Sequence, residues 1–106
     1  MNYSEGIYAK TNAELIIELG SRFKEYRLVC RLTQKQVAEQ AGVSLFTIKA
    51  FESGRAYNIT MGSFLAMLRA ISFLEEVEKL LPPLPPTPEM IEKMNKNKPK
   101  RIKNGK

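Results

Sequence analysis

The stretch LTQKQVAEQAGVSLFTIKAFESG, residues Leu32–Gly54, predicts two short helices separated by a very tight turn. Thr33 and Gln36 have the spacing of a capping box, in which each side chain satisfies a free backbone N–H group at the start of a helix. Gly42 tolerates the left-handed conformation that ends a helix. Ser44 is a favourable N-cap for the second helix, and the closing glycine is a favourable terminator.

The packing of this pair predicts which side of its second helix stays free. Two helices so close in sequence cross at a wide angle, and the nearest point then requires a small side chain, here Ala38. The residues spaced to lock the pair onto other helices are Val37, Ala41, Val43, Ile48 and Phe51. The residues left on the free side of the second helix are Leu45, Phe46, Lys49 and Ala50. These constraints are those of a helix-turn-helix, in which this side enters a DNA major groove.

The rest of the folded part is also expected to be helical, because no alternating strand pattern exceeds a few residues. A first helix, with Asn12 as its expected N-cap, carries on one face Ile16, Leu19, Phe23, Tyr26 and Cys30. A fourth helix begins near Thr60 and carries Phe64, Leu65, Leu68 and Ile71. A fifth helix is expected to open on a capping box of Ser72 and Glu75 and to carry Leu74, Val77, Leu80 and Leu81.

The chain is divided on this basis into four segments: an N-terminal arm (1–11), a helix-turn-helix domain (12–81), a Pro-rich spacer (82–88), and a short helix with a basic tail (89–106). The sequence PPLPPTP favours extended polyproline II and is interpreted as a stiff spacer rather than as an SH3-type ligand. Thr87 and Pro88 are expected to start the short helix as its cap and first residue. The final basic, low-complexity residues are expected to be disordered alone.

Composition excludes several classes of function. The chain has no His and one Cys, so His-based catalysis, His metal sites and internal disulfides are all impossible. Cys30 is interpreted as a small core residue rather than a reactive thiol. The sequence shows no nucleophile with a base, no metal-ligand cluster and no phosphate-binding glycine loop. We therefore expect no enzymatic activity and no cofactor. RNA binding is disfavoured, because no sheet or aromatic stacking platform is evident.

Localisation and charge give two further expectations. Neither a membrane-length apolar stretch nor a signal-peptide layout is present, which favours a cytoplasmic protein. The net charge is +6, of which residues 89–106 carry +5. Such a basic excess favours a polyanion partner, although a solvated tail that aids solubility is the alternative. A functional tail would lie along DNA phosphates or in a minor groove, or contact an acidic protein.

In these features the chain resembles the Cro/lambda-repressor-like family of regulators, also called the xenobiotic-response-element family. The resemblance runs from Leu19 to about Leu81 and is carried by "LGSRFKEYRLVCRLTQKQVAEQAGVS", "TIKAFESGRA" and "TMGSFLAMLRAI". It implies an all-α fold, a five-helix lambda-repressor-like DNA-binding domain. It also implies a sequence-specific regulator of transcription, most simply a repressor, that binds double-stranded DNA. A homodimer is expected because a single motif buries limited surface, whereas a dimer reads two half-sites.

The resemblance also implies roles for individual residues. Gln34 would contact phosphate, and the residues facing bases or their flanking backbone would be Ser44, Leu45, Phe46, Thr47, Lys49 and Ala50. The loop after the second helix of the pair would bind phosphate, and its residues in that role would be Arg55, Tyr57, Asn58 and Thr60. Arg27 of the first helix would form a structural ion pair with Glu52. Independently of the resemblance, the expected fifth helix offers more apolar surface than one small core needs, so its candidate dimer contact consists of Leu74, Val77, Leu80 and Leu81.

The chain departs from the family pattern at two places. Arg31 stands where a glycine is usual, so either a non-Gly residue is left-handed there, at a cost of about 1 kcal/mol, or the first helix ends differently. The recognition surface is also unusually apolar, because Leu45, Phe46 and Ala50 cannot read guanine or adenine edges. They can contact thymine methyl groups, or they pack against protein instead.

Two physiological roles stay open. One is a solitary repressor. The other is an antitoxin that represses its own operon and binds a toxin protein, since the segment LLPPLPPTPEMIEK and the basic tail resemble small regulators that accompany HipA-type kinase toxins. In that case the stripe of Met90, Ile91 and Met94 would fold onto the toxin.

Overall fold

The computed structural model describes residues 6–55, 58–85 and 87–97, and the regular structure in these ranges is entirely helical. In chain order the elements are η1 (Gly6–Ala9), α1 (Asn12–Val29), α2 (Gln34–Ala41), α3 (Leu45–Ser53), α4 (Met61–Ala70), η2 (Leu74–Lys79) and α5 (Pro88–Asn97). The predicted all-α fold is confirmed. Among the residues described, no helix combines the length and the apolar character that a membrane crossing requires.

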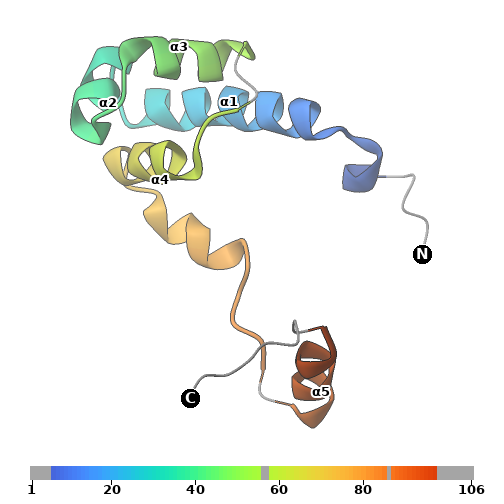
Figure 1. Cartoon of the computed structure of the whole chain (residues 1–106). Coiled ribbons are helices and arrows are strands. Elements are labelled where there is room, and N and C mark those ends of the chain that lie inside the picture. Colours follow the sequence, from blue (N-terminus) through green and yellow to red (C-terminus); the bar gives the residue numbers. More distant parts are fainter. Residues whose placement is uncertain (1–5, 56–57, 86, 98–106) are drawn as a thin grey trace, which may run out of the picture. The chain divides into compact units, whose positions relative to one another are not determined.

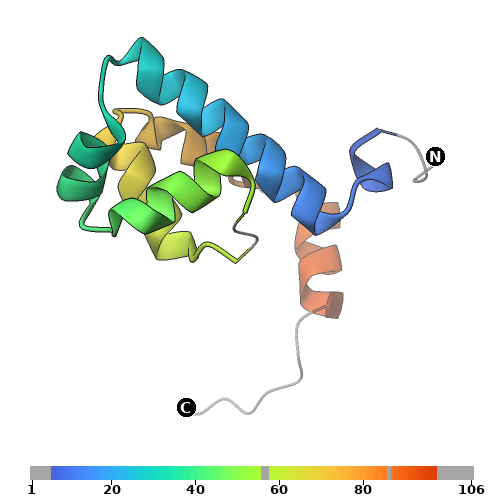
Figure 2. The ribbon, with the colours of Figure 1, turned by 90° about the horizontal axis from the view of Figure 1, so that it is seen from above.

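The chain separates into two compact units, Met1–Glu76 and Val77–Lys106. In the first unit α3 packs against α1, and α2 contacts both α3 and α4 (Figure 1). The view from above shows α1 and α3 crossing at an angle, with α2 at the end where α1 finishes (Figure 2). This arrangement leaves α3 covered on one side only.

The core of the first unit joins residues from all four of these helices. The side chains with almost no exposed surface are Val37, Ile48, Phe51, Met67 and Ile71. The ring of Phe51 lies 5.9 Å from that of Phe23 and 6.0 Å from that of Phe64, measured between centroids. Phe51 of α3 is therefore the centre around which α1 and α4 pack.

The buried face of α1 differs from the predicted one. Its buried residues are Gly20, Phe23 and Arg27, whereas Leu19 and Tyr26, both expected on the inner face, are more than two-fifths exposed. The helix is rotated in this way because Gly20 faces the backbone of α3. A Cβ atom at position 20 would overlap the carbonyl oxygen of Phe51 and lie 2.8 Å from its carbonyl carbon.

Helix starts follow one local rule, with a Thr or Ser side chain accepting a hydrogen bond from a backbone N–H group three residues later. The capping box of Thr33 and Gln36 is confirmed, with N–O distances of 2.8 and 3.0 Å. For α1 the expected cap Asn12 is wrong. Thr11 is the cap and forms its own capping box with Glu14, since its hydroxyl stands three residues before a Glu that can return the hydrogen bond.

Helix ends follow a second rule. In α1 the backbone N–H groups of Arg31 and Leu32 donate to the carbonyl groups of Leu28 and Arg27 at 3.0 and 3.2 Å, which is the Schellman arrangement. It requires a left-handed residue, and Arg31 has a φ of 59°. The same pair of bonds ends α3 at Gly54 and α4 at Ser72.

The expected capping box of Ser72 and Glu75 is therefore wrong. Ser72 has a φ of 66° and ends α4, whereas an N-cap has extended backbone. The segment that follows is the 3-10 helix η2 rather than a fifth α-helix. Only a short stretch separates Ser72 from Pro82, and a proline disfavours helical conformation in the residue before it.

The second unit contains the end of η2, the Pro-rich segment and α5. Helix α5 begins at Pro88 as predicted, and its N-cap Thr87 accepts a hydrogen bond from the N–H group of Met90 at 3.2 Å. Several large apolar side chains in this unit are at least half exposed: Leu80, Leu81, Leu84, Ile91 and Met94. The unit therefore presents apolar surface that it does not itself cover.

Candidate nucleic-acid interface

The turn between α2 and α3 is closed by backbone hydrogen bonds. Gly42 has a φ of 71°, as its place in the sequence predicts. The N–H groups of Gly42 and Val43 both donate to the carbonyl oxygen of Ala38, at 2.9 and 3.1 Å. Ser44 then caps α3 by accepting from the N–H group of Thr47 at 3.0 Å. The connection consequently takes only three residues and holds the two helices at a fixed angle.

The two sides of α3 differ sharply in exposure. Ile48 and Phe51 are buried, whereas Phe46 is 78 % exposed and Leu45 is 37 % exposed. Ala50 was expected on the free side, but it is only 8 % exposed. Its side chain is a single methyl group close to the helix axis, so longer neighbouring side chains screen it. The free side is therefore formed by Phe46 and Lys49 above a floor that includes Ala50.

A buried carboxylate ties the three helices behind this surface together. Arg27 Nε and a terminal guanidinium nitrogen donate to the two oxygens of Glu52 at 2.7 and 2.8 Å. The other guanidinium nitrogen donates to the carbonyl oxygen of Leu32 at 2.8 Å. Gln34 Nε2 donates to Glu52 Oε1 at 3.0 Å. Bidentate pairing of this kind fixes orientation as well as distance, so Glu52 sets the position of α3 relative to α1 and of the Gln34 side chain.

The hydroxyl groups in the first turn of α3 are largely occupied by hydrogen bonds within the protein. Ser44 Oγ and Thr47 Oγ1 lie 2.8 Å apart and share a hydrogen bond. Of the two hydroxyl hydrogens, one is consumed within this pair, and Ser44 Oγ also accepts the capping bond. Both residues were predicted to face bases or flanking backbone. Their main observed role is to hold the start of the helix.

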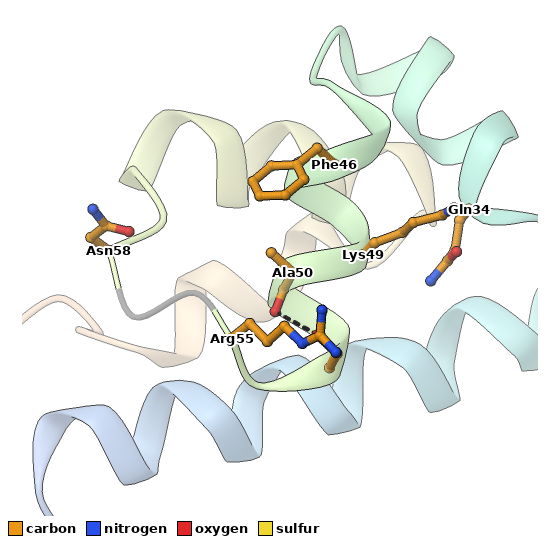
Figure 3. A pocket seen from close by; sticks show the side chains of 7 residues that line it. Gln34, Phe46, Lys49, Ala50, Arg55 and Asn58 are labelled. Carbon is orange, nitrogen blue, oxygen red and sulfur yellow. Dashed lines mark hydrogen bonds between the residues drawn. The ribbon is translucent and has the colours of Figure 1, made fainter.

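A surface concavity of about 580 Å³ lies against the free side of α3. Figure 3 shows Phe46 and Ala50 on α3, with Lys49 extending toward Gln34 at the start of α2. Arg55 and Asn58 come from the segment that follows α3. The residues that line the concavity are Gln34, Phe46, Lys49, Ala50, Ser53, Arg55 and Asn58.

The chemistry of this lining suits a polyanion. Among the described residues that line the concavity, Lys49 and Arg55 are cationic and none is acidic. Amide groups of Gln34 and Asn58 add neutral hydrogen-bonding capacity at its rim. Phosphate groups are bound by such cations and amides, which position a protein on the duplex. Among the described residues no cluster of potential metal ligands is present.

The structure thus brings together six of the predicted site residues: Gln34, Phe46, Lys49, Ala50, Arg55 and Asn58. Ser44, Leu45, Thr47 and Thr60 lie outside this lining, and Thr60 is the N-cap of α4. Tyr57 lies outside the described residues. Ser53 also lines the concavity but was missed by the sequence reasoning. Its place seven residues after Phe46, two helical turns along the same face, is the signal that could have found it.

Comparison with protein families agrees with this geometry. A model of the helix-turn-helix domain matches residues 18–80, which is more than half of the 106 residues. The chain belongs to the family of helix-turn-helix domains, a class of DNA-binding regulators. A comparison with curated proteins gives no match.

Proposed function

We propose that this protein is a sequence-specific regulator of transcription of the Cro/lambda-repressor-like type, acting as a repressor on double-stranded DNA. The observation that carries the proposal is the free side of α3, where the exposed ring of Phe46 and the cation Lys49 line a concavity together with Arg55. In a helix-turn-helix this side of the second helix enters the major groove. Repression then follows from occupancy of an operator that overlaps a promoter.

Selection of bound duplexes from a random pool, at a stated salt concentration, tests the proposal. The expected result is a defined half-site rather than uniform binding. Lys49→Ala should weaken binding to the selected duplex. Lys24→Ala is the matched control, because Lys24 is an exposed lysine on α1 outside the concavity. Equal affinity for selected and scrambled duplexes would refute sequence-specific binding.

We further propose a homodimer, because a single helix-turn-helix contacts a limited length of DNA and dimers read two half-sites about 34–36 Å apart. The proposed contact residues are Leu74, Val77, Leu80 and Leu81. In support, Leu80 and Leu81 are exposed, the latter by 91 %. Leu81→Ser should then shift the sedimenting species from dimer to monomer, and a wild-type monomer at tens of micromolar would contradict the dimer.

The antitoxin role is the second candidate. It is supported by the apolar surface of the second unit, where Leu84, Ile91 and Met94 are each at least half exposed. A toxin that covers this surface would explain why it carries apolar side chains. Co-expression with the product of an adjacent gene, followed by purification, tests this role. A stable complex that is lost in Ile91→Ser supports the antitoxin, and recovery of the regulator alone contradicts it.

We propose no catalytic role and no cofactor for the chain. The groups around the concavity are suited to binding phosphate and base edges, and the proposed binding of DNA requires no bond-breaking step.

A further inference from the structure

The apolar first turn of α3 carries a more specific inference, which rests on the proposed DNA-binding function. Residues near the start of a recognition helix contact base edges in the major groove. In this protein the side chains there are Leu45 and Phe46, between the paired hydroxyl groups of Ser44 and Thr47. Neither Leu45 nor Phe46 can form the paired hydrogen bonds by which Arg, Asn or Gln distinguish guanine and adenine.

Apolar side chains read a different feature of the major groove. Thymine presents its C5-methyl group there, and contact with that methyl group is the specific interaction open to alanine, threonine methyl and phenylalanine. The ring of Phe46 is 78 % exposed in the free protein. Its contact with a methyl group would remove apolar surface of both partners from water, which is favourable.

The surroundings of Phe46 favour DNA over protein as the partner of this ring. Phe46 lines the same concavity as Lys49 and Arg55, and the described lining residues include no carboxylate. Lys49 lies three residues beyond Phe46, on the same side of the helix. In a DNA major groove, thymine methyl groups lie between two rows of phosphates. The aromatic ring can contact such a methyl group while the two neighbouring cations contact phosphates.

We infer that Phe46, assisted by Leu45, recognises the 5-methyl group of pyrimidines, so that this protein distinguishes thymine from uracil and 5-methylcytosine from cytosine. The second distinction follows because 5-methylcytosine carries its methyl group at the same ring position as thymine. Binding would then respond to cytosine methylation wherever a cytosine occupies the position that Phe46 contacts.

The test uses the full chain and the duplex selected from the random pool. Each thymine of the half-site is replaced in turn by deoxyuridine, which removes only the methyl group. At the position under Phe46 the dissociation constant should rise about fourfold, equivalent to the ~0.8 kcal/mol for burying one methylene-sized group. Two further duplexes carry cytosine or 5-methylcytosine in place of that thymine. The 5-methylcytosine duplex should bind more tightly than the cytosine duplex, by a similar factor.

The Phe46→Ala variant assigns the effect to this side chain. It should keep the wild-type melting temperature, because the ring is exposed. It should also lose most of the discrimination between the thymine and deoxyuridine duplexes, with the remainder due to Leu45. Phe46→Leu serves as a second variant that retains an apolar side chain and part of the discrimination. Val29→Ala is the matched control, since Val29 is an exposed apolar residue on α1, and it should discriminate as wild type does.

The outcomes separate this inference from the proposed function. Failure to bind any duplex specifically would overturn both. Specific binding with equal affinity for thymine and deoxyuridine at every position would overturn the methyl-reading inference alone. Discrimination that persists undiminished in both Phe46 variants would likewise overturn it, as would loss of dimerisation in Phe46→Ala with unchanged DNA preference.

Discussion

Replacement of Gly20 by alanine tests the closest approach in the fold. The added Cβ atom would overlap the carbonyl oxygen of Phe51. That oxygen belongs to the backbone of α3 and cannot rotate away as a flexible side chain can. The overlap is relieved only if α1 and α3 move apart, which also loosens the contact between the Phe23 and Phe51 rings.

The size of the effect follows from two opposing contributions. Overpacking in a well-packed core costs about 1–3 kcal/mol, and a backbone obstacle favours the upper end of that range. Alanine gains about 1 kcal/mol over glycine from helix propensity. We therefore expect Gly20→Ala to lower the free energy of unfolding by about 2 kcal/mol.

Gly62 provides a matched control within the same protein. It also lies in a helix, and apart from its chain neighbours and the adjacent backbone of that helix, no heavy atom comes within 4 Å of the position its Cβ would occupy. Gly62→Ala should therefore raise the free energy of unfolding by up to about 1 kcal/mol.

Thermal and urea unfolding of both full-length variants, followed by circular dichroism, would measure the difference. A gap of about 3 kcal/mol corresponds to roughly 12–24 °C in Tm for a domain of this size. A Gly20→Ala variant as stable as Gly62→Ala would refute the close approach of α1 and α3.

Three further predictions concern charge and backbone strain. Glu52→Ala should lower the free energy of unfolding in urea by about 3–5 kcal/mol, because it leaves Arg27 buried without its carboxylate. As the control, Glu39→Ala on the exposed side of α2 should change that free energy by less than about 0.5 kcal/mol. Equal melting temperatures for the two variants would contradict the pairing of Arg27 with Glu52. Arg31→Gly should raise the free energy of unfolding by about 1 kcal/mol, since glycine adopts a positive φ without steric cost, and a loss of stability would show that the arginine side chain has a compensating contact. Deletion of residues 97–106 should weaken binding to all DNA sequences and reduce the slope of log K against log salt concentration; an unchanged slope would exclude phosphate contacts by the tail.

Where the structure depends on neighbouring residues, the sequence predicts it. The sequence correctly predicts four features of the motif: the capping box at Thr33, the left-handed Gly42, the cap Ser44 and the terminator Gly54. Each involves residues at most four or five positions apart, so the responsible side chain and the backbone group that it satisfies lie in the same short stretch. The buried anchors Ile48 and Phe51 followed from the same local spacing, because the turn fixes which side of α3 faces inward.

The inner face of α1 was decided instead by a contact between distant residues. Periodicity favoured Leu19 and Tyr26, but the observed face buries Gly20 and Arg27. A glycine and an arginine carry no apolar signal in the sequence. Gly20 is inside because the carbonyl of Phe51 leaves room for no side chain, and Arg27 is inside because Glu52 neutralises it.

The sequence by itself therefore determined where the helices of the DNA-binding motif begin and end, since hydrogen bonds among near neighbours control those points. Only the tertiary structure decided which surfaces meet, and with them the burial of Gly20 and Arg27 on the inner face of α1. Burial depends on what another helix covers, and that partner lies tens of residues away along the chain.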